Sequence, residues 1–171
     1  MHRPIFTLIS ALTVLHFGAA DAGEVEKLPA SGKAKFQVSY VQWASHDVEM
    51  GDRAGFGNFE FGGVTRNTDG KSWFDRMAEY CTGQYYWGAG SEQPGNGSCL
   101  YVDADGDQVM VNWANTAPYD GTKQIVGGTG KYAGITGKGV FDGTQLKTAA
   151  AGMDYFITDV ELDFQLKAAT Q

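Results

Sequence analysis

Residues 155–166 read Tyr-Phe-Ile-Thr-Asp-Val-Glu-Leu-Asp-Phe-Gln-Leu. From Val160 to Leu166, apolar and polar side chains alternate at every position. Successive side chains of a β-strand point to opposite faces, so this period of two predicts a strand with one face on a core and one face in water.

Short segments of the same kind recur along the chain between glycine-rich turns. The sequence holds 24 Gly and only 4 Pro, and 13% of its residues are aromatic. No window of about 12 residues shows the apolar period of a helix. This pattern predicts an all-β barrel or sandwich of roughly eight or nine strands. Besides the quoted segment, the expected strands are 33–43, 55–61, 72–82, 84–87, 98–103, 108–114, 123–126 and 137–142.

The N-terminus has the three parts of a secretory signal peptide. Arg3 precedes an apolar run over residues 5–17, and small residues ending in Ala20-x-Ala22 follow it. The alternative is a membrane anchor, but the run of about 13 residues is shorter than the roughly 20 that a spanning helix needs. We therefore expect an exported protein, periplasmic or secreted, without a membrane anchor after cleavage. The expected division is a signal peptide over 1–22, a loose leader over 23–32 and a single β-domain over 33–171.

The formal net charge of the chain is −7. An acidic surface repels phosphate backbones, which argues against nucleic acids and anionic membrane surfaces as partners.

Cys81 and Cys99 are the two cysteines of the chain. Export places them in an oxidising compartment, where a disulfide is the usual state. The segment between them is rich in glycine, and closing a loop of this size contributes about 3 kcal/mol in a chain-entropy model. The alternatives are a metal site and a reactive thiol. Two cysteines with no nearby histidine make a poor metal set, and His46 is the only histidine after the signal peptide.

Residues 103–107, Asp-Ala-Asp-Gly-Asp, lie between two expected strands. An Asp-Gly pair between alternating segments predicts a hairpin turn, because both residues tolerate positive φ. The alternative is a calcium loop, which needs Gly at its sixth position and Glu at its twelfth. Gln108 and Ala114 occupy those positions. A hairpin is therefore favoured, and weak cation binding by the three carboxylates is the remaining alternative.

Residues 127–139 read Gly-Gly-Thr-Gly-Lys-Tyr-Ala-Gly-Ile-Thr-Gly-Lys-Gly. The Gly-Lys pair also occurs in phosphate loops, but Ile125 and Tyr132 stand where that motif needs Gly and Ser or Thr. A dinucleotide motif would have to open a helix, and no helical pattern follows. We therefore expect no nucleotide cofactor. Gly128 and Gly130 are expected to serve a turn, through positive φ or close packing.

This glycine segment resembles the Gly-Gly-Thr-Gly-x-Phe-x-x-Ala-x-Gly signature of dirigent proteins and allene oxide cyclases. It is more similar still to small exported bacterial proteins with the same barrel, which share Cys81, Cys99, the acidic hairpin and residues 127–137 in that order. The resemblance implies an eight-stranded antiparallel, calycin-like barrel with a central cavity over residues 33–171. Among relatives, allene oxide cyclases cyclise a fatty-acid epoxide, and dirigent proteins steer the coupling or cyclisation of phenolic intermediates. Relatives also often self-associate. The resemblance assigns no catalytic residue here.

The segment 72–87 supplies candidate site residues. Read as a strand, it places Trp73, Asp75, Met77 and Glu79 on one face. An inward carboxyl among aromatic side chains would have a raised pKa and could act as an acid or base, which makes Asp75 and Glu79 the candidate catalytic residues. The alternative is a strand with solvated charges and core aromatics. The candidate ligand-binding aromatics are Trp73, Tyr85, Trp87 and Trp113.

Three functions fit these features. The first is a barrel that binds a small hydrophobic or phenolic ligand. The second is a cyclase, isomerase or stereo-directing protein that needs no metal or nucleotide, and the third is a structural or interaction barrel. An apolar cavity would favour the first, a cavity of a few hundred Å³ with inward carboxylates the second, and a filled interior the third. A sequon at Asn96 would be glycosylated only in a eukaryotic secretory pathway.

Overall fold

The computed structural model describes residues 27–51, 54–88 and 95–167. The expected signal peptide and the first part of the leader, residues 23–26, lie outside the described residues. Residues 27–30 have no regular structure, although Leu28 is buried. No helix in the described ranges is long and apolar enough to cross a membrane.

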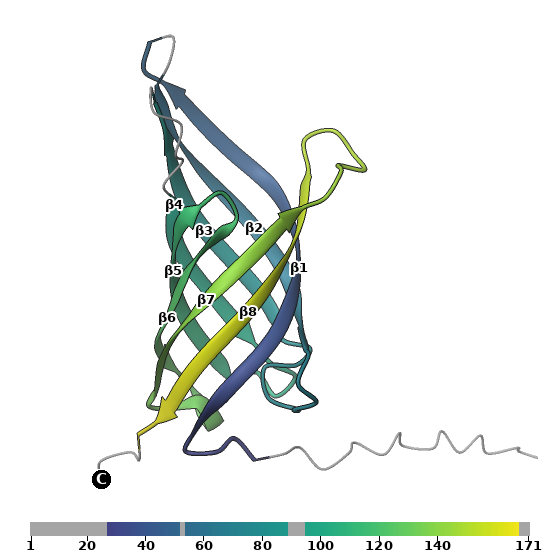
Figure 1. The fold of residues 1–171 in the computed structure, drawn as a ribbon, viewed down its shortest axis with the longest axis vertical. Coiled ribbons are helices and arrows are strands. Elements are labelled where there is room, and N and C mark those ends of the chain that lie inside the picture. The colour runs from purple at the N-terminus through teal and green to yellow at the C-terminus, as the bar shows by residue number, and fades with distance from the viewer. Residues whose placement is uncertain (1–26, 52–53, 89–94, 168–171) are drawn as a thin grey trace, which may run out of the picture.

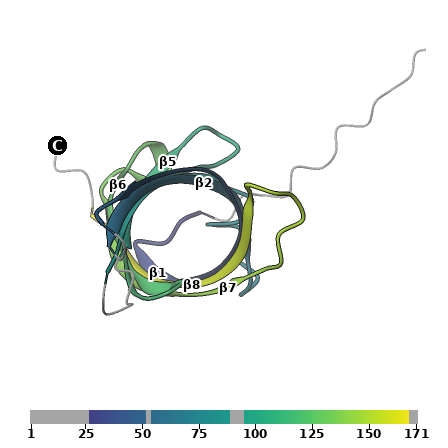
Figure 2. The same cartoon turned by 90° about the horizontal axis from the view of Figure 1, so that it is seen from above.

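Eight strands form a closed antiparallel barrel (Figures 1 and 2). Each strand pairs with its successor along the chain, and β8 pairs with β1 to close the ring. A single 3-10 turn, η1 (Gly130–Tyr132), lies between β6 and β7. The all-β, eight-stranded antiparallel barrel is therefore confirmed. The strands are β1 (Ser31–Glu49), β2 (Gly55–Asn67), β3 (Ala78–Trp87), β4 (Gly95–Val102), β5 (Gln108–Ala117), β6 (Asp120–Gly128), β7 (Ile135–Gln145) and β8 (Asp154–Leu166).

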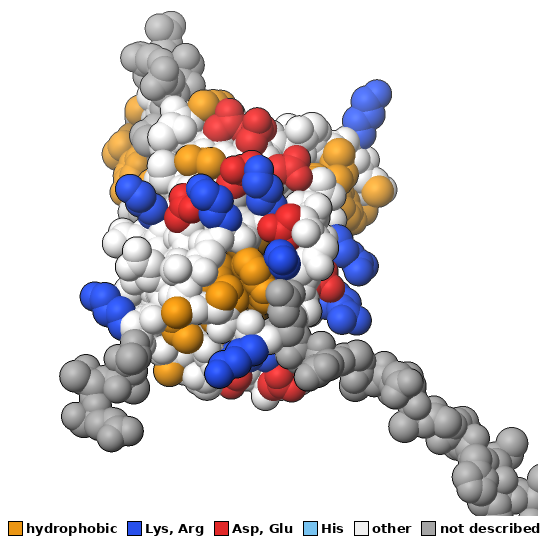
Figure 3. All heavy atoms as spheres, turned by 60° about the horizontal axis from the view of Figure 1, so that its bottom comes forward, with side chains coloured by type: hydrophobic (Ala, Val, Ile, Leu, Met, Phe, Trp, Pro, Cys, Tyr) orange, Lys and Arg blue, Asp and Glu red, His pale blue; other side chains and the backbone are white. Residues whose placement is uncertain are grey.

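The alternating segment at the C-terminus forms β8 as expected. Its apolar side chains at Val160, Leu162 and Phe164 are buried, and the acidic side chains between them are exposed. On the outer face Lys33 pairs with Asp163 at 2.8 Å. Charges of both signs are mixed over the face of the molecule shown in Figure 3. Such exposed pairs contribute little to stability, so the buried inner face of β8 carries most of its contribution.

The segment 72–77 is not part of a strand, which corrects the expected strand over 72–82. Phe74 and Arg76 have φ angles of 57° and 53°, which extended backbone does not allow. Asp75 holds this turn, because its carboxylate accepts hydrogen bonds from the Asn67 backbone at 2.9 Å and from Arg76 Nε at 3.0 Å. The loop 68–77 therefore folds back, and β3 is one strand where two were expected.

The barrel has a filled half and a hollow half. The lower half, at the end in Figure 1 that carries η1 and the loop 68–77, is packed with buried apolar side chains. The loop contributes Trp73, Phe74 and Met77 to this core, and Phe74 stacks on Phe36 with ring centroids 5.6 Å apart. The loop thus closes the lower end. The other buried residues of the lower half include Val38, Tyr101, Val109, Val111, Ile125, Tyr132, Ile135, Val160, Leu162 and Phe164.

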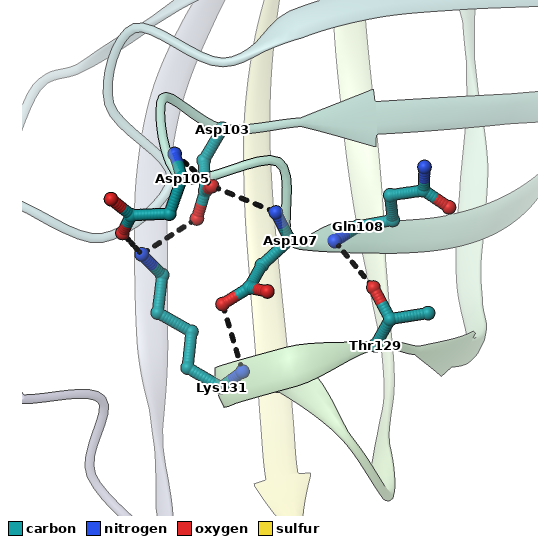
Figure 4. A network of polar contacts seen from close by, with 6 residues as sticks. All are labelled: Asp103, Asp105, Asp107, Gln108, Thr129 and Lys131. Carbon is teal, nitrogen blue, oxygen red and sulfur yellow. Dashed lines mark hydrogen bonds and ion pairs between the residues drawn. The ribbon is translucent and has the colours of Figure 1, made fainter.

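The acidic segment 103–107 forms the hairpin turn between β4 and β5, as expected, with Gly106 at φ 85°. The Asp103 carboxylate accepts backbone hydrogen bonds from Asp105 and Asp107 at 2.9 and 3.1 Å (Figure 4). Lys131 Nζ lies 2.7 Å from Asp103 and 2.6 Å from Asp105. The ammonium group therefore stands where the alternative interpretation would place a cation, which favours the plain hairpin.

The pKa values of this network follow from its geometry. Burial by itself would raise the pKa of Asp103, but the hydrogen bond from Lys131 and the backbone N–H groups hold it below its usual value. Burial would likewise lower the pKa of Lys131, but its bonds to Asp103 and Asp105 raise it well above its usual value. Both groups are therefore charged near neutral pH.

Gly130 is required where the 3-10 turn packs against this hairpin. Its φ is 53°, and an added Cβ would lie 1.7 Å from Asp107 Oδ1. At Gly128 an added Cβ would lie 2.7 Å from the Tyr132 backbone oxygen. The glycines thus serve turn geometry and close packing, as the sequence predicts.

Candidate functional site

The upper half of the barrel holds a cavity of about 310 Å³ that is partly open to solvent. Its walls are mainly aromatic, and a few polar side chains interrupt them. The aromatic lining comprises Tyr40, Phe59, Phe61, Tyr85, Trp113, Tyr119, Phe141 and Phe156. The polar lining comprises Gln42, Asn115, Lys123, Asp154 and Thr158.

Inward-facing glycines allow these large rings to line the cavity without filling it. A Cβ at Gly83 would lie 2.3 Å from Trp113 Cζ2, so the indole lies against the bare backbone of the wall. Tyr85 covers Gly57 in the same way, with a Cβ-to-ring distance of 2.7 Å. Each ring needs a glycine opposite it, because any larger residue would push the ring into the cavity.

The four aromatic residues expected to bind a ligand lie in three different places. Tyr85 and Trp113 line the cavity. Trp87 stands beside Tyr85, with ring centroids 5.5 Å apart, and packs over Gly55 near the rim. Trp73 lies in the lower half against Phe164, at 5.3 Å between ring centroids, and is not among the residues that line the cavity.

A buried polar cluster forms the floor of the cavity, between the two halves. Lys123 Nζ on β6 donates to Tyr101 OH at 2.6 Å, to Glu79 Oε1 at 3.3 Å and to Tyr40 OH at 3.4 Å. The side chains of Lys123 and Glu79 are 4% and 0% exposed. We call Tyr40, Glu79, Tyr101 and Lys123 the floor cluster.

Both tyrosines of the floor cluster keep their protons. Burial, together with the nearby charge of Glu79, raises the pKa of Tyr40 and of Tyr101 well above the usual value. Glu79 Oε2 has no hydrogen-bond partner among the described residues. A buried polar atom without a partner is costly, and such atoms are often found at functional sites.

The two carboxyls proposed from the sequence occupy unlike positions. Glu79 points into the barrel and belongs to the floor cluster. Asp75 is a structural residue of the loop 68–77, bonded to the backbone of Asn67. Sequence reasoning missed Lys123. A signal was present, since Lys123 stands two residues before the buried Ile125 and so shares the inward face of β6.

Cys81 and Cys99 form the expected disulfide, with their Cα atoms 4.1 Å apart across β3 and β4. Cys99 also lines the cavity. Together with Glu79 the two sulfurs have the spacing of a metal-binding group. Because the disulfide leaves no thiolate to coordinate an ion, this group does not fit a metal while the cysteines are oxidised.

No family model and no curated protein sequence matches the chain. Among solved structures it is similar to the pterocarpan synthase dirigent protein GePTS1, at 12% identity and a TM-score of 0.51, covering 84% of this chain and 91% of that one. It is also similar to the pterocarpan synthase dirigent protein PsPTS1, at 11% identity and a TM-score of 0.50, covering 82% and 100% of the two chains. The chain therefore has a dirigent-like barrel fold.

Proposed function

We propose that the protein binds one small hydrophobic or phenolic molecule in the cavity of the upper half. The observation that carries this proposal is a cavity of about 310 Å³ lined by eight aromatic side chains, with a buried polar cluster at its floor and a few further polar side chains in its walls. Ligand sites are commonly concave, mainly apolar and about 300–1,000 Å³ in volume, with a few placed polar groups. The fold shared with proteins named as pterocarpan synthases supports the same proposal.

The lining sets how such a ligand would lie. Its ring would pack between Trp113 and the aromatic side chains of β1, β2 and β8. An aromatic contact of this kind contributes about 0.5–1.5 kcal/mol beyond the buried area. A hydroxyl or carbonyl oxygen would point to Tyr40 and Lys123, the polar members of the floor cluster that line the cavity. The site thus suits a molecule with an apolar ring and one oxygen-bearing end.

Dye displacement tests the proposal. An environment-sensitive hydrophobic dye should bind at about one molecule per chain and change the tryptophan fluorescence, because Trp113 lines the cavity. Phenolics, terpenoids or fatty acids should displace the dye and raise the melting temperature by mass action. A panel of these compounds that neither displaces the dye nor shifts melting would contradict the proposal and favour a structural barrel.

A matched pair of variants on β5 locates the site. Asn115→Trp places a large ring in the cavity lining, whereas Asn112→Trp places the same ring on the exposed outer face of the same strand. The first variant should lose dye binding and the second should keep it. Equal binding by both variants would show that the dye binds elsewhere.

A second candidate function is acid–base catalysis of a cyclisation or isomerisation, for which a cavity of about 310 Å³ with the inward carboxyl group of Glu79 is the expected interior. The floor cluster favours it, because Tyr40 is a protonated hydroxyl facing the cavity and Glu79 lies behind it, inside the barrel. A positioned acid or base contributes about 10²- to 10⁴-fold to a rate. Conversion of a bound ligand should then be lost in Tyr40→Phe or Glu79→Gln and kept in Asp75→Asn. If ligands bind but are not converted, catalysis is contradicted and only the ligand-binding function remains.

Export also belongs to the proposal. The disulfide is consistent with an oxidising, extracytoplasmic compartment. The mature chain should begin near Gly23, which N-terminal sequencing or intact mass of the exported protein would show. A membrane-bound species that retains Met1 would contradict export by a cleaved signal.

A further inference from the structure

Lys123 is the only lysine in the described part of the chain whose side chain is buried inside the barrel. It lines the cavity, so a bound ligand can meet it directly. The position is costly for an ammonium ion, because burial removes its hydration and every partner must be supplied by the protein. A costly buried lysine at the surface of a cavity indicates that it interacts with the ligand of that cavity.

Lys123 has one carboxylate partner and its Nζ lies 5.3 and 5.8 Å from the ring centroids of Tyr101 and Phe141, but its hydrogen bonds differ in length. Only the bond to Tyr101 OH is short, at 2.6 Å. The contact with Glu79 Oε1 is 3.3 Å, whereas charge-assisted N–H···O bonds are typically about 2.7–2.9 Å. Glu79 in turn leaves Oε2 without a partner among the described residues. The long contact with Glu79 leaves the Lys123 nitrogen at the cavity surface, where a bound ligand can reach it.

We propose that Lys123 forms an imine with an aldehyde or ketone bound in the cavity. This rests on the proposed function, since the carbonyl compound must first occupy the same space. The aromatic lining favours an aryl aldehyde, with its ring between the walls and its carbonyl group at the floor. A lysine desolvated in an apolar pocket is the usual nucleophile of Schiff-base chemistry.

The reaction balances with the groups of the floor cluster alone. Lys123 first gives a proton to Glu79, and the neutral nitrogen attacks the carbonyl carbon. The carbonyl oxygen takes the proton of the Glu79 carboxyl, directly or through Tyr40, while the new N–H returns a proton to Glu79. The hydroxyl group then takes that proton and leaves as water. The products are a protonated imine, the Glu79 carboxylate and one water molecule, and no oxidant or reductant takes part.

Reductive trapping of the full chain tests the proposal. The protein is incubated with stoichiometric 4-hydroxybenzaldehyde and cyanoborohydride, and the adduct is mapped by peptide mass spectrometry. One adduct per chain is expected, at Lys123, with the mass of the aldehyde less one oxygen atom. Labelling spread over the exposed lysines with none at Lys123 would overturn the proposal, and this result needs no variant.

Variants sharpen the test. Lys123→Arg keeps the positive charge and should abolish the specific adduct, whereas Lys138→Arg on the exposed face of the neighbouring strand should keep it. Glu79→Gln removes the proton acceptor and should slow labelling by roughly 10²-fold. Full-rate labelling of Glu79→Gln at Lys123 would remove Glu79 from the mechanism.

A non-reacting analogue separates this inference from the proposed function. 4-Hydroxybenzyl alcohol has nearly the same shape as the aldehyde and cannot form an imine. If the alcohol displaces the dye and the aldehyde leaves Lys123 unmodified, the imine is wrong and ligand binding stands. If the aldehyde neither labels Lys123 nor displaces the dye and the alcohol also fails, both proposals are wrong.

Discussion

The lower and upper halves of the barrel are built from the same eight strands, yet one is solid and the other is hollow. An eight-stranded barrel is just wide enough for side chains to fill or for one small ligand to enter. In the lower half the loop 68–77 decides the outcome, because it folds inward and adds Trp73, Phe74 and Met77 to the core. In the upper half the aromatic rings lie against glycines of the wall and leave about 310 Å³ between them. The two halves have the same number of strands. Whether the interior is a packed core or a cavity therefore depends on how the loops and aromatic rings pack inside it.

The floor cluster marks the boundary between the two halves. Below it the buried residues are almost all apolar, and above it the cavity begins. A buried ion pair is weak evidence for stability, because desolvation offsets much of its attraction. Because the Lys123–Glu79 pair lies directly under the cavity, we expect it to contact a bound ligand.

Phe164→Ala should break the lower half and give the largest effect. The ring is 2% exposed and packs against Trp73 and Phe74, so its loss leaves a closed cavity in a tight core. We expect the free energy of unfolding to fall by about 3–5 kcal/mol. In the upper half Phe156→Ala only enlarges an existing cavity and should cost only the burial of the ring, about 1.5–3 kcal/mol. Urea unfolding measures both, and equal losses would refute the distinction between the halves.

Removing the disulfide should give the next largest effect. Cys81→Ala combined with Cys99→Ala releases a loop with a sequence separation of 18 residues. The expected loss is about 2–4 kcal/mol. Because Cys99 lines the cavity, hydrogen exchange should rise in the upper parts of β3 and β4 more than in β8. Uniform exchange throughout the barrel would instead show that the disulfide stabilises both halves alike.

Asp103→Asn should weaken the lower end by roughly 1–3 kcal/mol, because the amide no longer pairs with Lys131. Lys131 and the backbone N–H groups lower the pKa of Asp103 in the folded state, against the opposing effect of burial. Its stabilisation is therefore complete above the unfolded-state pKa of about 3.9 and is lost as the pH falls through the lower, folded-state pKa. Between about pH 6 and about pH 3, the free energy of unfolding should fall less in the variant than in the wild type. An equal fall in the free energy of unfolding in both proteins would show that ionised Asp103 does not contribute to stability.

Tyr85→Phe in the upper half should give the smallest effect. The hydroxyl donates to Asp47 at 2.5 Å at the rim of the barrel, where both side chains meet solvent. The expected change in the free energy of unfolding is about 1 kcal/mol or less. Dye affinity should also change little, because the ring that lines the cavity is retained. A loss as large as that of Phe164→Ala would mean that the rim holds the barrel together.

The sequence by itself determined the local and repeating features of this protein. The alternation in 155–166 predicted the buried and exposed faces of β8, the Asp-Gly pair predicted the β4–β5 hairpin, and the two cysteines predicted the disulfide. These features could be read because each depends on neighbours along the chain or on a fixed period of two. The resemblance in the glycine segment then extended them to a closed barrel.

Only the tertiary structure decided where the barrel is filled and which polar groups meet. Alternation reports the face of a strand but not the depth along the barrel, so Trp73 and Tyr85 looked alike in sequence and lie in opposite halves. The positive φ angles of Phe74 and Arg76 broke an apparently regular strand, because packing against Phe36 outweighs the local preference of those residues. Lys123 on β6 meets Glu79 on β3 and Tyr101 on β4 inside the barrel, because closure of the ring brings strands that do not pair within side-chain reach of one another.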